Sequence, residues 1–346
     1  MPHHNAFNDV HQKIIVPDTL AGKRLDQALS ILLNDYSRAQ LQKWLKQGEI
    51  LVDSKVKKAK DRLIGGEEIC LNIRFETKTK WLAQDIPLDI VYEDEAIIII
   101  NKPANFVVHP GAGNPENTLS NALLAHHPNF EKIPRAGIVH RLDKDTTGLI
   151  VAAKTLQAHH CLVAQLSQRK VTREYQAIAT GCITMGKTIH ANIGRNPHNR
   201  LKMAVTPNGK DAITHFTILE RYRAHTRIRC HLETGRTHQI RVHMQHIRAP
   251  LLGDPLYNPR LKIAKGTTSK LGDSLRQFKR QALHAYKLRF THPKSGETVS
   301  FTMKPPEDMQ MLIRHLREDA APLYAYDDAW DDFDDMNDFE TDETDE

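Results

Sequence analysis

The sequence predicts an α+β protein of two domains. Its length of 346 residues fits two domains. In the larger part, strand-like runs of β-branched residues outnumber helical segments and follow one another, which favours an α+β sheet over a parallel βαβ array. A polar stretch of few apolar side chains, residues 74–88, separates the two parts. The expected order is a flexible N-terminus (1–17), a small domain (18–76), a linker (77–88), a large domain (89–317) and an acidic, disordered tail (318–346).

The composition is that of a soluble globular protein. Hydrophobic residues make up 40% and charged residues 26% of the chain. The longest aliphatic run, Ala96 to Ile100, is far shorter than the ~20 apolar residues of a membrane span, and no secretory signal is visible. The four cysteines are widely separated, which argues against a disulfide scaffold or a cysteine zinc site. We therefore expect a cytoplasmic protein with no membrane partner.

The net charge of +6 hides a strong asymmetry along the chain. Residues 327–346 contain 12 acidic and no basic side chains, which leaves 48 basic and 30 acidic side chains elsewhere, a net charge of +18. A body this basic is expected to bind polyanions, because each phosphate contact releases counterions. The alternative is a soluble protein whose scattered surface lysines bind nothing in particular.

Residues 18–76 are predicted to form two helices followed by a strand, a turn and a second strand. Ser37 is a suitable N-cap for the second helix, and Gly48 ends it. The strands are expected at 49–53 and 65–71. The positions at helical spacing are Asp26, Leu29, Leu32 and Leu33 in the first helix and Leu41, Trp44 and Leu45 in the second.

The second of these helices and the segment after it are basic. Residues 38–62 contain eight basic and three acidic side chains, a net charge of +5. This arrangement resembles the S4 RNA-binding domain, on the matching runs 24–26, 37–38, 48–52 and 65–67. In S4 domains the helices and the following loop form a basic ridge against the RNA backbone. A helix–helix–strand module with a solvated basic face is the alternative.

The large domain is predicted to consist mainly of strands. Its first helix is expected at 117–126, and the basic segment 258–280 is interpreted as a surface loop. The tail carries too much like charge to fold alone. The expected strands are 89–92, 97–103, 174–180, 214–220, 227–232 and 288–291.

The densest chemical signal lies in residues 137–154. An apolar strand, a polar turn and a second apolar strand follow one another, and the turn places Asp143 between Arg141 and Lys144. Neighbouring cations keep a carboxylate ionised, and an ionised carboxylate with little solvent around it is a workable nucleophile. A hairpin whose turn carries only solvated charges is the alternative. A kinase site is excluded, because the lysine follows the His-Arg pair and no DFG sequence is present.

Two further segments could carry chemistry. In residues 232–243 a strand is followed by a turn at Gly235 and then by a cation-rich helix, which could supply fixed positive charge to a site. The alternative interpretation is a capped helix with a basic, solvated face. Tyr175 opens a strand and could equally be a half-buried sheet tyrosine. We expect no metal site, because no carboxylate or cysteine completes a ligand set for the nearby histidines His238, His243 and His246.

Together and in this order, these segments resemble the RluA family of pseudouridine synthases. The resemblance extends from about residue 18 to 317 and so covers both domains. The matching runs are His140 to Asp143 followed by Thr147-Gly148, Arg173 to Tyr175, Thr234 to Arg241, and residues 97–103, 108–110 and 250–254.

The resemblance implies a role for each site residue. Asp143 is the essential carboxylate, which either attacks the ribose or assists glycal formation. Arg241 pairs with Asp143 and holds it ionised. Tyr175 stacks on the extruded base and is a candidate for proton removal, while Arg141 fills the gap that the flipped nucleotide leaves. The implied substrate-binding residues are His140, Arg141 and Ile240, together with Arg38 and Lys43 of the basic helix.

The implied fold is a catalytic domain on a mixed, bent sheet, preceded by an S4 domain. The implied reaction is isomerisation of uridine to pseudouridine in RNA, without cofactor or metal. Within the family the resemblance is greatest to enzymes of large-subunit (23S) ribosomal RNA acting at helix 69. We therefore expect a monomer whose partner is ribosomal RNA or a precursor of the large subunit. The alternatives are the same chemistry on another ribosomal site or tRNA, and a non-catalytic RNA-binding or ribosome-assembly protein.

Overall fold

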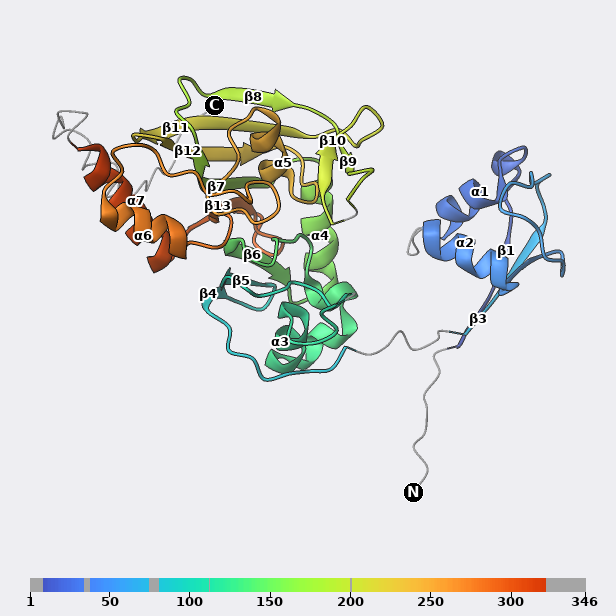
Figure 1. Ribbon diagram of the computed structural model, residues 1–346. Helices are drawn as coiled ribbons and strands as arrows, with labels where there is room; N and C mark the ends of the chain where they lie inside the picture. Colours follow the sequence, from blue (N-terminus) through green and yellow to red (C-terminus); the bar gives the residue numbers. More distant parts are fainter. Residues whose placement is uncertain (1–8, 34–37, 75–80, 112, 200, 322–346) are drawn as a thin grey trace, which may run out of the picture. The chain divides into compact units, whose positions relative to one another are not determined.

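The computed structural model divides into two compact units, Met1–Lys80 and Trp81–Glu346 (Figure 1). Ser37, the predicted helix cap, lies outside the residues that the structure describes, and so does the predicted tail from residue 322 onward. Within the described part of the chain, no helix is long and apolar enough to cross a membrane. The described residues are 9–33, 38–74, 81–111, 113–199 and 201–321.

The first unit packs two α-helices against a three-stranded antiparallel sheet of order β1-β3-β2. The predicted apolar positions Leu29, Leu41 and Leu45 are buried in its core. Gly48 has a φ of 73° and follows the last helical residue, as predicted. Its elements are β1 (Asp9–Ile15), a 3-10 turn η1 (Asp18–Leu20), α1 (Leu25–Leu32), α2 (Arg38–Gln47), β2 (Ile50–Val52) and β3 (Glu68–Arg74).

Strand β1 lies where the sequence predicts a flexible N-terminus. It pairs with β3 over its whole length, from Asp9 opposite Arg74 to Ile15 opposite Glu68. The ladder uses backbone N–H and C=O groups, which polar residues supply as well as apolar ones. The polar composition of residues 1–17 therefore did not reveal the strand.

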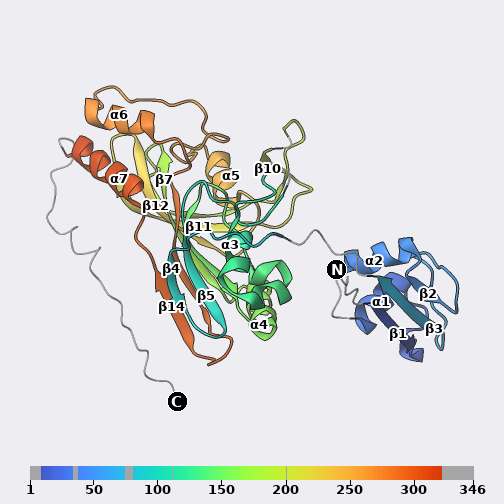
Figure 2. The same cartoon turned by 90° about the horizontal axis from the view of Figure 1, so that it is seen from below.

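The second unit is built on a nine-stranded mixed sheet (Figures 1 and 2). Neighbouring strands follow the order β4-β5-β6-β13-β7-β12-β11-β8, and β14 pairs with β13. Strands β6 and β13 run parallel, while the other pairs in the sheet are antiparallel. This confirms the predicted mixed sheet. The strands are β4 (Ile90–Glu93), β5 (Ile97–Lys102), β6 (Thr147–Ala153), β7 (Thr172–Thr180), β8 (Lys187–His190), β11 (Ile213–Arg221), β12 (His225–Leu232), β13 (Leu283–Thr291) and β14 (Thr298–Thr302).

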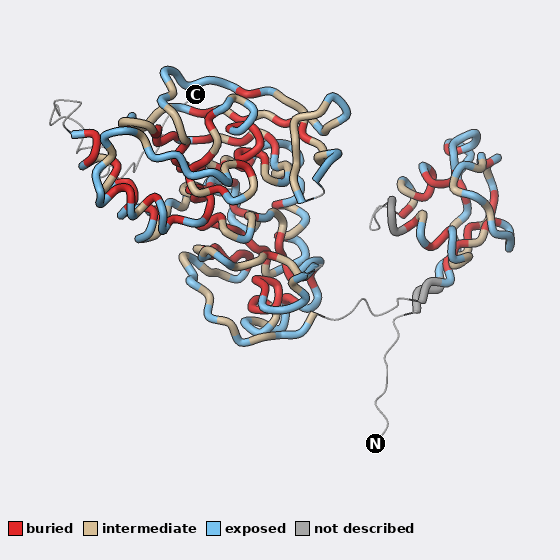
Figure 3. Tube along the Cα trace, in the orientation of Figure 1, coloured by how far each residue is buried: buried red, intermediate tan, exposed pale blue. Residues whose placement is uncertain are grey.

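Strands β5 and β6 form the middle of the core and are buried on both faces (Figure 3). In β5, Ile98 and Ile100 pack in one apolar cluster, whereas Ile97 and Ile99 pack in another. This alternation is what successive strand residues produce. The helical elements are α3 (Leu119–His126), 3-10 turns η2 (Pro128–Lys132) and η3 (Pro134–Gly137), α4 (Leu156–Ser167), α5 (Gln239–His246), α6 (Ser269–Gln277) and α7 (Glu307–Ala320). A separate hairpin consists of β9 (Ile193–Arg195) and β10 (Met203–Val205).

The 137–154 segment contains one strand where the sequence predicts two. Arg135 and Ala136 both have left-handed backbone angles, and Gly137 follows with a φ of 75°. This turn leaves Ile138 with a single isolated bridge to Ala152, and regular pairing begins at β6. The residues around Asp143 therefore form an irregular loop.

The predicted surface loop 258–280 contains helix α6. Its Leu271 and Leu275 lie four residues apart on one helical face and are buried in a cluster with Leu312 and Leu316 of α7. The two helices lie side by side (Figures 1 and 2). Helix α7 also extends past residue 318, where the sequence predicts the tail to begin.

Residues 81–88, which the sequence assigns to the linker 77–88, belong to the second unit. The backbone N–H of Gln84 donates to the Asn121 carbonyl at 3.1 Å, and the Asn121 side chain donates to the Leu82 carbonyl at 2.7 Å. Residues 81–88 are therefore attached to α3, which sequence composition did not indicate.

Candidate active site

Asp143 lies on the loop between η3 and β6, with 16% of its side chain exposed. The buried lysine Lys102 attaches this loop to the segment after β5. Its Nζ donates to the carbonyls of Pro103 and Phe106 in that segment at 2.7 and 2.8 Å, and to the carbonyl of Lys144 in the loop at 2.9 Å. Burial lowers the pKa of Lys102 to about 7, against the opposing charges of Asp145 and Asp143. The three carbonyls offset the loss of water around the ammonium and fix the backbone next to Asp143.

The other end of the loop is anchored where β6 meets β13. The Thr147 hydroxyl donates to His284 Nδ1 at 2.9 Å, and His284 Nε2 donates to the Met303 carbonyl at 2.8 Å. The Gln281 amide donates to the Thr146 hydroxyl at 3.1 Å. Burial lowers the pKa of His284 to about 4, so it is neutral in this role. Asp143 is thus presented by a loop that is fastened at both ends.

Arg241 approaches Asp143 from helix α5. Its Nη1 donates to Asp143 Oδ2 at 2.9 Å, while Nε and Nη2 donate to Asp254 Oδ2 and Oδ1 at 2.7 and 3.0 Å. Only 5% of the Arg241 side chain and none of the Asp254 side chain is exposed. Burial opposes the charge of Arg241, but the hydrogen bonds and charges of Asp254 and Asp143 outweigh it and raise the pKa of Arg241. The sequence-predicted pair of Asp143 and Arg241 is therefore in direct contact.

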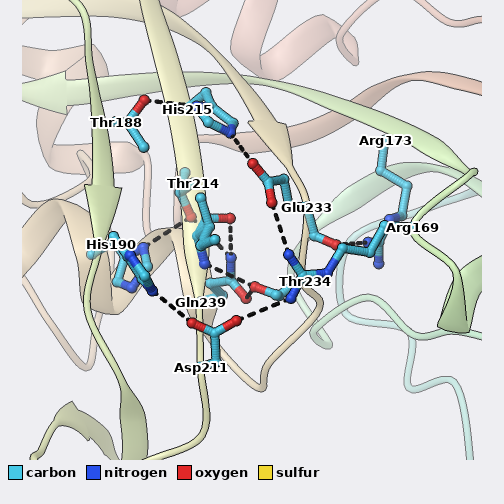
Figure 4. Close-up of polar contacts among 12 residues, drawn as sticks. Arg169, Arg173, Thr188, His190, Asp211, Thr214, His215, Glu233, Thr234 and Gln239 are labelled. Carbon is cyan, nitrogen blue, oxygen red and sulfur yellow. Dashed lines mark hydrogen bonds and ion pairs between the residues drawn. The ribbon is translucent and has the colours of Figure 1, made fainter.

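A polar network at the start of α5 determines where Arg241 lies (Figure 4). The buried Gln239 amide accepts from the Thr234 hydroxyl and the Arg236 N–H, and donates to the Ile213 carbonyl and the Thr214 hydroxyl. A fully bonded side chain of this kind has one orientation. It joins the turn after β12 to strand β11 and so fixes the first turn of α5.

The exposed side of the same turn carries an ion-pair chain (Figure 4). Arg169 bridges Asp211 and Glu233 at 3.0 and 2.9 Å. Each carboxylate is also bonded to a histidine, Asp211 to His190 and Glu233 to His215, both at 2.7 Å. Exposed pairs contribute little individually, but this chain ties β8, β11 and the turn together.

Tyr175 and Ile240 belong to the same buried apolar cluster. Tyr175 lies on β7, opposite Cys230 of β12 and Ala285 of β13. Burial raises the pKa of Tyr175; the nearby Arg173 opposes this shift and the charge of Asp143 adds to it. The two predicted pocket residues therefore belong to one apolar cluster, and Tyr175 lies close enough to Asp143 to sense its charge.

The structure gives an environment for the remaining predicted site residues. His140 is half-buried; its Nε2 accepts the N–H of Val151 at 3.2 Å, and burial with the charge of Arg173 lowers its pKa to about 3. Arg141 is exposed. In the first unit Lys43 is exposed, while the side chain of Arg38 lies outside the described part of α2.

Four residues of the site were missed or given no role from sequence. Asp254, Lys102 and His238 were matched only as parts of longer runs, and His238 was also weighed as a metal ligand. Tyr257 carried no signal, because a tyrosine in a loop is ordinary. Among the described residues, no group of three or more His, Cys, Asp or Glu side chains is arranged to hold a metal. His243 has both ring nitrogens engaged, with Thr214 and the Ala191 carbonyl.

Comparison with known proteins identifies the family. A family model described as RNA pseudouridylate synthase matches residues 96–246, and an S4 domain model matches residues 23–69. The chain is 52% identical over 310 residues to the Ribosomal large subunit pseudouridine synthase D of Xanthomonas campestris pv. campestris, covering 90% of this chain and 94% of that protein. The protein of the same name from Escherichia coli (strain K12) is 52% identical over 305 residues, covering 88% of this chain and 94% of that one. This chain belongs to the RNA pseudouridylate synthase family.

Solved structures agree in fold with the synthase. Human RNA Pseudouridylate Synthase Domain Containing 4 matches with a TM-score of 0.53 and 24% identity, covering 66% of this chain and 92% of that one. Human RNA Pseudouridylate Synthase Domain Containing 1 matches with a TM-score of 0.51 and 25% identity, covering 65% and 86%. Both resemblances predicted from the sequence, to the RluA family and to the S4 domain, are confirmed. The synthase is an RNA-modifying enzyme, not a scaffold.

Proposed function

We propose that this synthase converts uridine to pseudouridine in large-subunit ribosomal RNA, at helix 69, with Asp143 as its essential carboxylate. The support for the RNA class is the name of its relatives, large-subunit pseudouridine synthases that are 52% identical over most of both chains. The choice of helix 69 within that RNA rests on the sequence resemblance alone. We expect a monomer acting in the cytoplasm, where ribosomal RNA is made and modified.

The contact between Asp143 and Arg241 is the observation that carries the proposed role of Asp143. The guanidinium holds Oδ2 at 2.9 Å, which fixes the plane of the carboxylate and places a positive charge beside it. None of the described residues donates a hydrogen bond to Oδ1. One oxygen is thus restrained by protein and the other is left for the ribose. This arrangement suits both attack on the sugar and assistance to glycal formation.

The reaction breaks the glycosidic C–N bond, rotates the base and forms a C–C bond. A base inside RNA structure must leave its stack first. Arg141 is exposed, two residues before Asp143, and is suited to fill the resulting gap. Tyr175 and Ile240 provide an aromatic and an aliphatic wall for the extruded base. Because burial raises the pKa of Tyr175, the phenol stays protonated, which favours stacking over proton removal.

The S4 domain would supply affinity. Its segment 38–62 has a net charge of +5, and cations of this kind bind RNA phosphates independently of sequence. Arg38 and Lys43 are the residues of α2 that we assign to this role. The catalytic unit would then need to recognise only the target nucleotide and its surroundings.

Substitution of Asp143 by Asn tests the catalytic assignment. The Asn side chain keeps size and hydrogen bonding but removes the charge, so we expect turnover to fall by a factor on the order of 10⁴ while RNA binding survives. Tritium release from RNA containing 5-tritiated uridine measures turnover, and protein prepared from a strain without the host enzyme removes the background. Turnover near wild type in that preparation would contradict the assignment.

Pseudouridine mapping of total RNA from a deletion strain tests the target. Loss of pseudouridine in helix 69 of 23S ribosomal RNA, restored by the wild-type gene and not by its Asp143→Asn variant, is the expected result. Loss at another ribosomal site or in tRNA instead would move the same chemistry to a different RNA.

A further inference from the structure

A chain of polar contacts leads from the β9–β10 hairpin to Asp143 through Tyr257 and His238. The backbone N–H of Met203, the first residue of β10, donates to the Tyr257 hydroxyl at 2.8 Å. The same hydroxyl lies 2.9 Å from His238 Nδ1. The other ring nitrogen of that histidine, Nε2, lies 3.9 Å from Asp143 Oδ2.

The Tyr257 oxygen accepts the Met203 N–H and keeps its own proton available to donate to His238 Nδ1. The Asp143 carboxylate on the other side of the ring favours this direction, because it attracts a proton on Nε2. An imidazole that accepts at Nδ1 carries its proton on Nε2 when neutral. Burial lowers the pKa of His238, although the charge of Asp143 opposes this, so the neutral ring prevails. The Nε2–H then faces the carboxylate.

The backbone of His238 supports a functional role for this geometry. It has φ 58° and ψ 22°, a left-handed conformation, directly before the first residue of α5. Such a conformation is unfavourable for a non-glycine residue and persists only where surrounding structure holds it. Here the Tyr257 ring packs edge-on against the imidazole at 5.7 Å, and the Arg241 guanidinium lies 5.0 Å from the same ring. Tyr257 therefore contacts both residues that face Asp143.

We propose that Tyr257 and His238 are positioning residues: the Tyr257 hydroxyl fixes the tautomer of His238 that directs its Nε2–H at Asp143 Oδ2. This rests on the proposed role of Asp143. The contact of 3.9 Å is longer than a hydrogen bond and shortens to one in the RNA complex, as polar contacts of unliganded active sites commonly do. Oδ2 is then held by Arg241 and His238 together, and the hairpin is connected to the reacting carboxylate by one continuous chain.

Three substitutions separate this role from simple packing. Tyr257→Phe keeps the ring, with its contacts to Arg241 and His238, and removes only the hydroxyl. His238→Asn keeps an acceptor near the Nδ1 position and tolerates the left-handed backbone, but removes the Nε2–H. His238→Gln is the matched opposite, because it offers a donor near Nε2 and loses the acceptor near Nδ1. Melting temperatures of the three variants report whether the fold is kept.

Single-turnover rates on the helix 69 RNA are the first measurement. We expect Tyr257→Phe and His238→Asn each to slow the chemical step about tenfold while RNA affinity stays within about twofold, because neither residue binds RNA in this proposal. The double variant should be no slower than the slower single variant, since both act through one chain. We expect His238→Gln to be faster than His238→Asn. Wild-type rates in Tyr257→Phe and His238→Asn, or additive losses in the double variant, would overturn the proposal.

The tautomer is the second measurement, and it does not depend on catalysis. In protein labelled with ¹⁵N-histidine, the ring signals absent from His238→Asn belong to His238. We expect them to show a proton on Nε2 in the wild type and a mixture of tautomers in Tyr257→Phe. A proton on Nδ1 in the wild type would refute the proposal.

The Asp143→Asn variant distinguishes failure of this inference from failure of the proposed function. If Asp143→Asn is inactive and the Tyr257 and His238 variants react like wild type, the carboxylate assignment stands and the positioning role is refuted. If Asp143→Asn is active, both are refuted, because there is no reacting carboxylate to position.

Discussion

At the scale of the residue, the Arg241 guanidinium is shared between two carboxylates. It donates once to Asp143 and twice to Asp254, which is fully buried. A buried charge that loses its partner is far more costly than the pair is stabilising. Asp254 therefore holds Arg241 in place, and Arg241 in turn orients Asp143. Asp254 thus fixes the geometry of the Asp143–Arg241 pair without any need to contact the substrate.

Substitution of Arg241 by Met tests this dependence. The change leaves Asp254 buried without a counter-charge, so we expect the free energy of unfolding to fall by about 3–5 kcal/mol. Turnover should be lost as well, because Asp143 has lost its hydrogen-bond donor. Denaturant unfolding and tritium release measure the two effects.

The double variant Arg241→Met with Asp254→Asn separates stability from catalysis. It has no buried charge at this position, so part of the stability should return. Turnover should stay low, because Asp143 Oδ2 still lacks its hydrogen bond from Arg241. Recovery of turnover together with stability would mean that Arg241 serves only the fold.

At the scale of the element, the parallel pairing of β6 with β13 brings two distant segments of the chain together at the end of the Asp143 loop. Thr147 and Gly148 pair with His284 and Ala285. Gly148 has a φ of 105°, and a Cβ at this position would lie 2.3 Å from the Ala285 carbonyl oxygen. Backbone cannot move aside as a flexible side chain can, so only glycine allows this pairing.

We predict that Gly148→Ala destabilises the second unit by about 3 kcal/mol or more, through steric overlap and backbone strain together. Gly296→Ala is the matched control, because Gly296 has a φ of 78° but a Cβ added there would meet no atom within 4 Å. We expect it to cost about 1 kcal/mol. Equal losses in denaturant unfolding would show that the backbone angle, and not the close approach of β13, makes glycine necessary.

At the scale of the whole molecule, the chain consists of two units with separate cores. The first contains one apolar cluster, and the second contains four. The residues that contact Asp143 belong to the second unit, Trp81–Glu346. We therefore expect a cut between Lys80 and Trp81 to separate the proposed catalytic site from the RNA affinity proposed for the first unit.

Removal of residues 1–80 should leave a folded enzyme that still modifies RNA at high concentration. Because the deleted segment carries the +5 charge of residues 38–62, we expect weaker RNA binding and a shallower dependence of affinity on salt. Filter binding over a series of salt concentrations measures both. The same affinity and salt slope in both proteins would exclude an RNA-binding role for the first unit.

Buried histidines predict acid sensitivity of the second unit. Burial lowers the pKa of His225 and His284 from 6.5 to about 4, with Asp319 opposing the shift at His225. Between about pH 6.5 and 4 the unfolded chain binds these protons and the folded chain does not. Stability is therefore full above about pH 6.5 and falls as the pH drops, by up to about 1.4 kcal/mol per pH unit for each histidine.

Denaturant unfolding at several pH values measures this slope. The variant His284→Gln can still accept from Thr147 and donate to the Met303 carbonyl, but it does not titrate, so we expect a shallower loss of stability on acidification. Burial raises the pKa of Glu220, but Arg317 and Arg227 outweigh this and lower it, which shifts its titration away from the histidine range. An unchanged slope in the variant would contradict the assignment of a neutral, buried His284.

Much of the protein could be inferred from neighbouring residues. A run of β-branched residues predicted β5, and alternating apolar side chains predicted β7 and β12. Local runs such as residues 140–143 and 234–241 carried the family resemblance. Among the elements that were missed, two had a local signal that was weak or misread. Strand β1 is stabilised by a backbone ladder that polar residues can form, and the amphipathic spacing of α6 was outweighed by its basic, Gly- and Ser-containing surroundings.

Contacts between distant residues were decided by the tertiary structure alone. Asp143 and Arg241 are 98 positions apart, and Thr147 and His284 are 137 apart. The role of Asp254 as second partner of Arg241, and of Tyr257 and Lys102 as supports, exists only once these segments meet. Propensity and periodicity are properties of adjacent residues and can be seen in the chain. Which distant groups meet depends on the free energy of packing the whole sheet and its helices, to which every segment contributes.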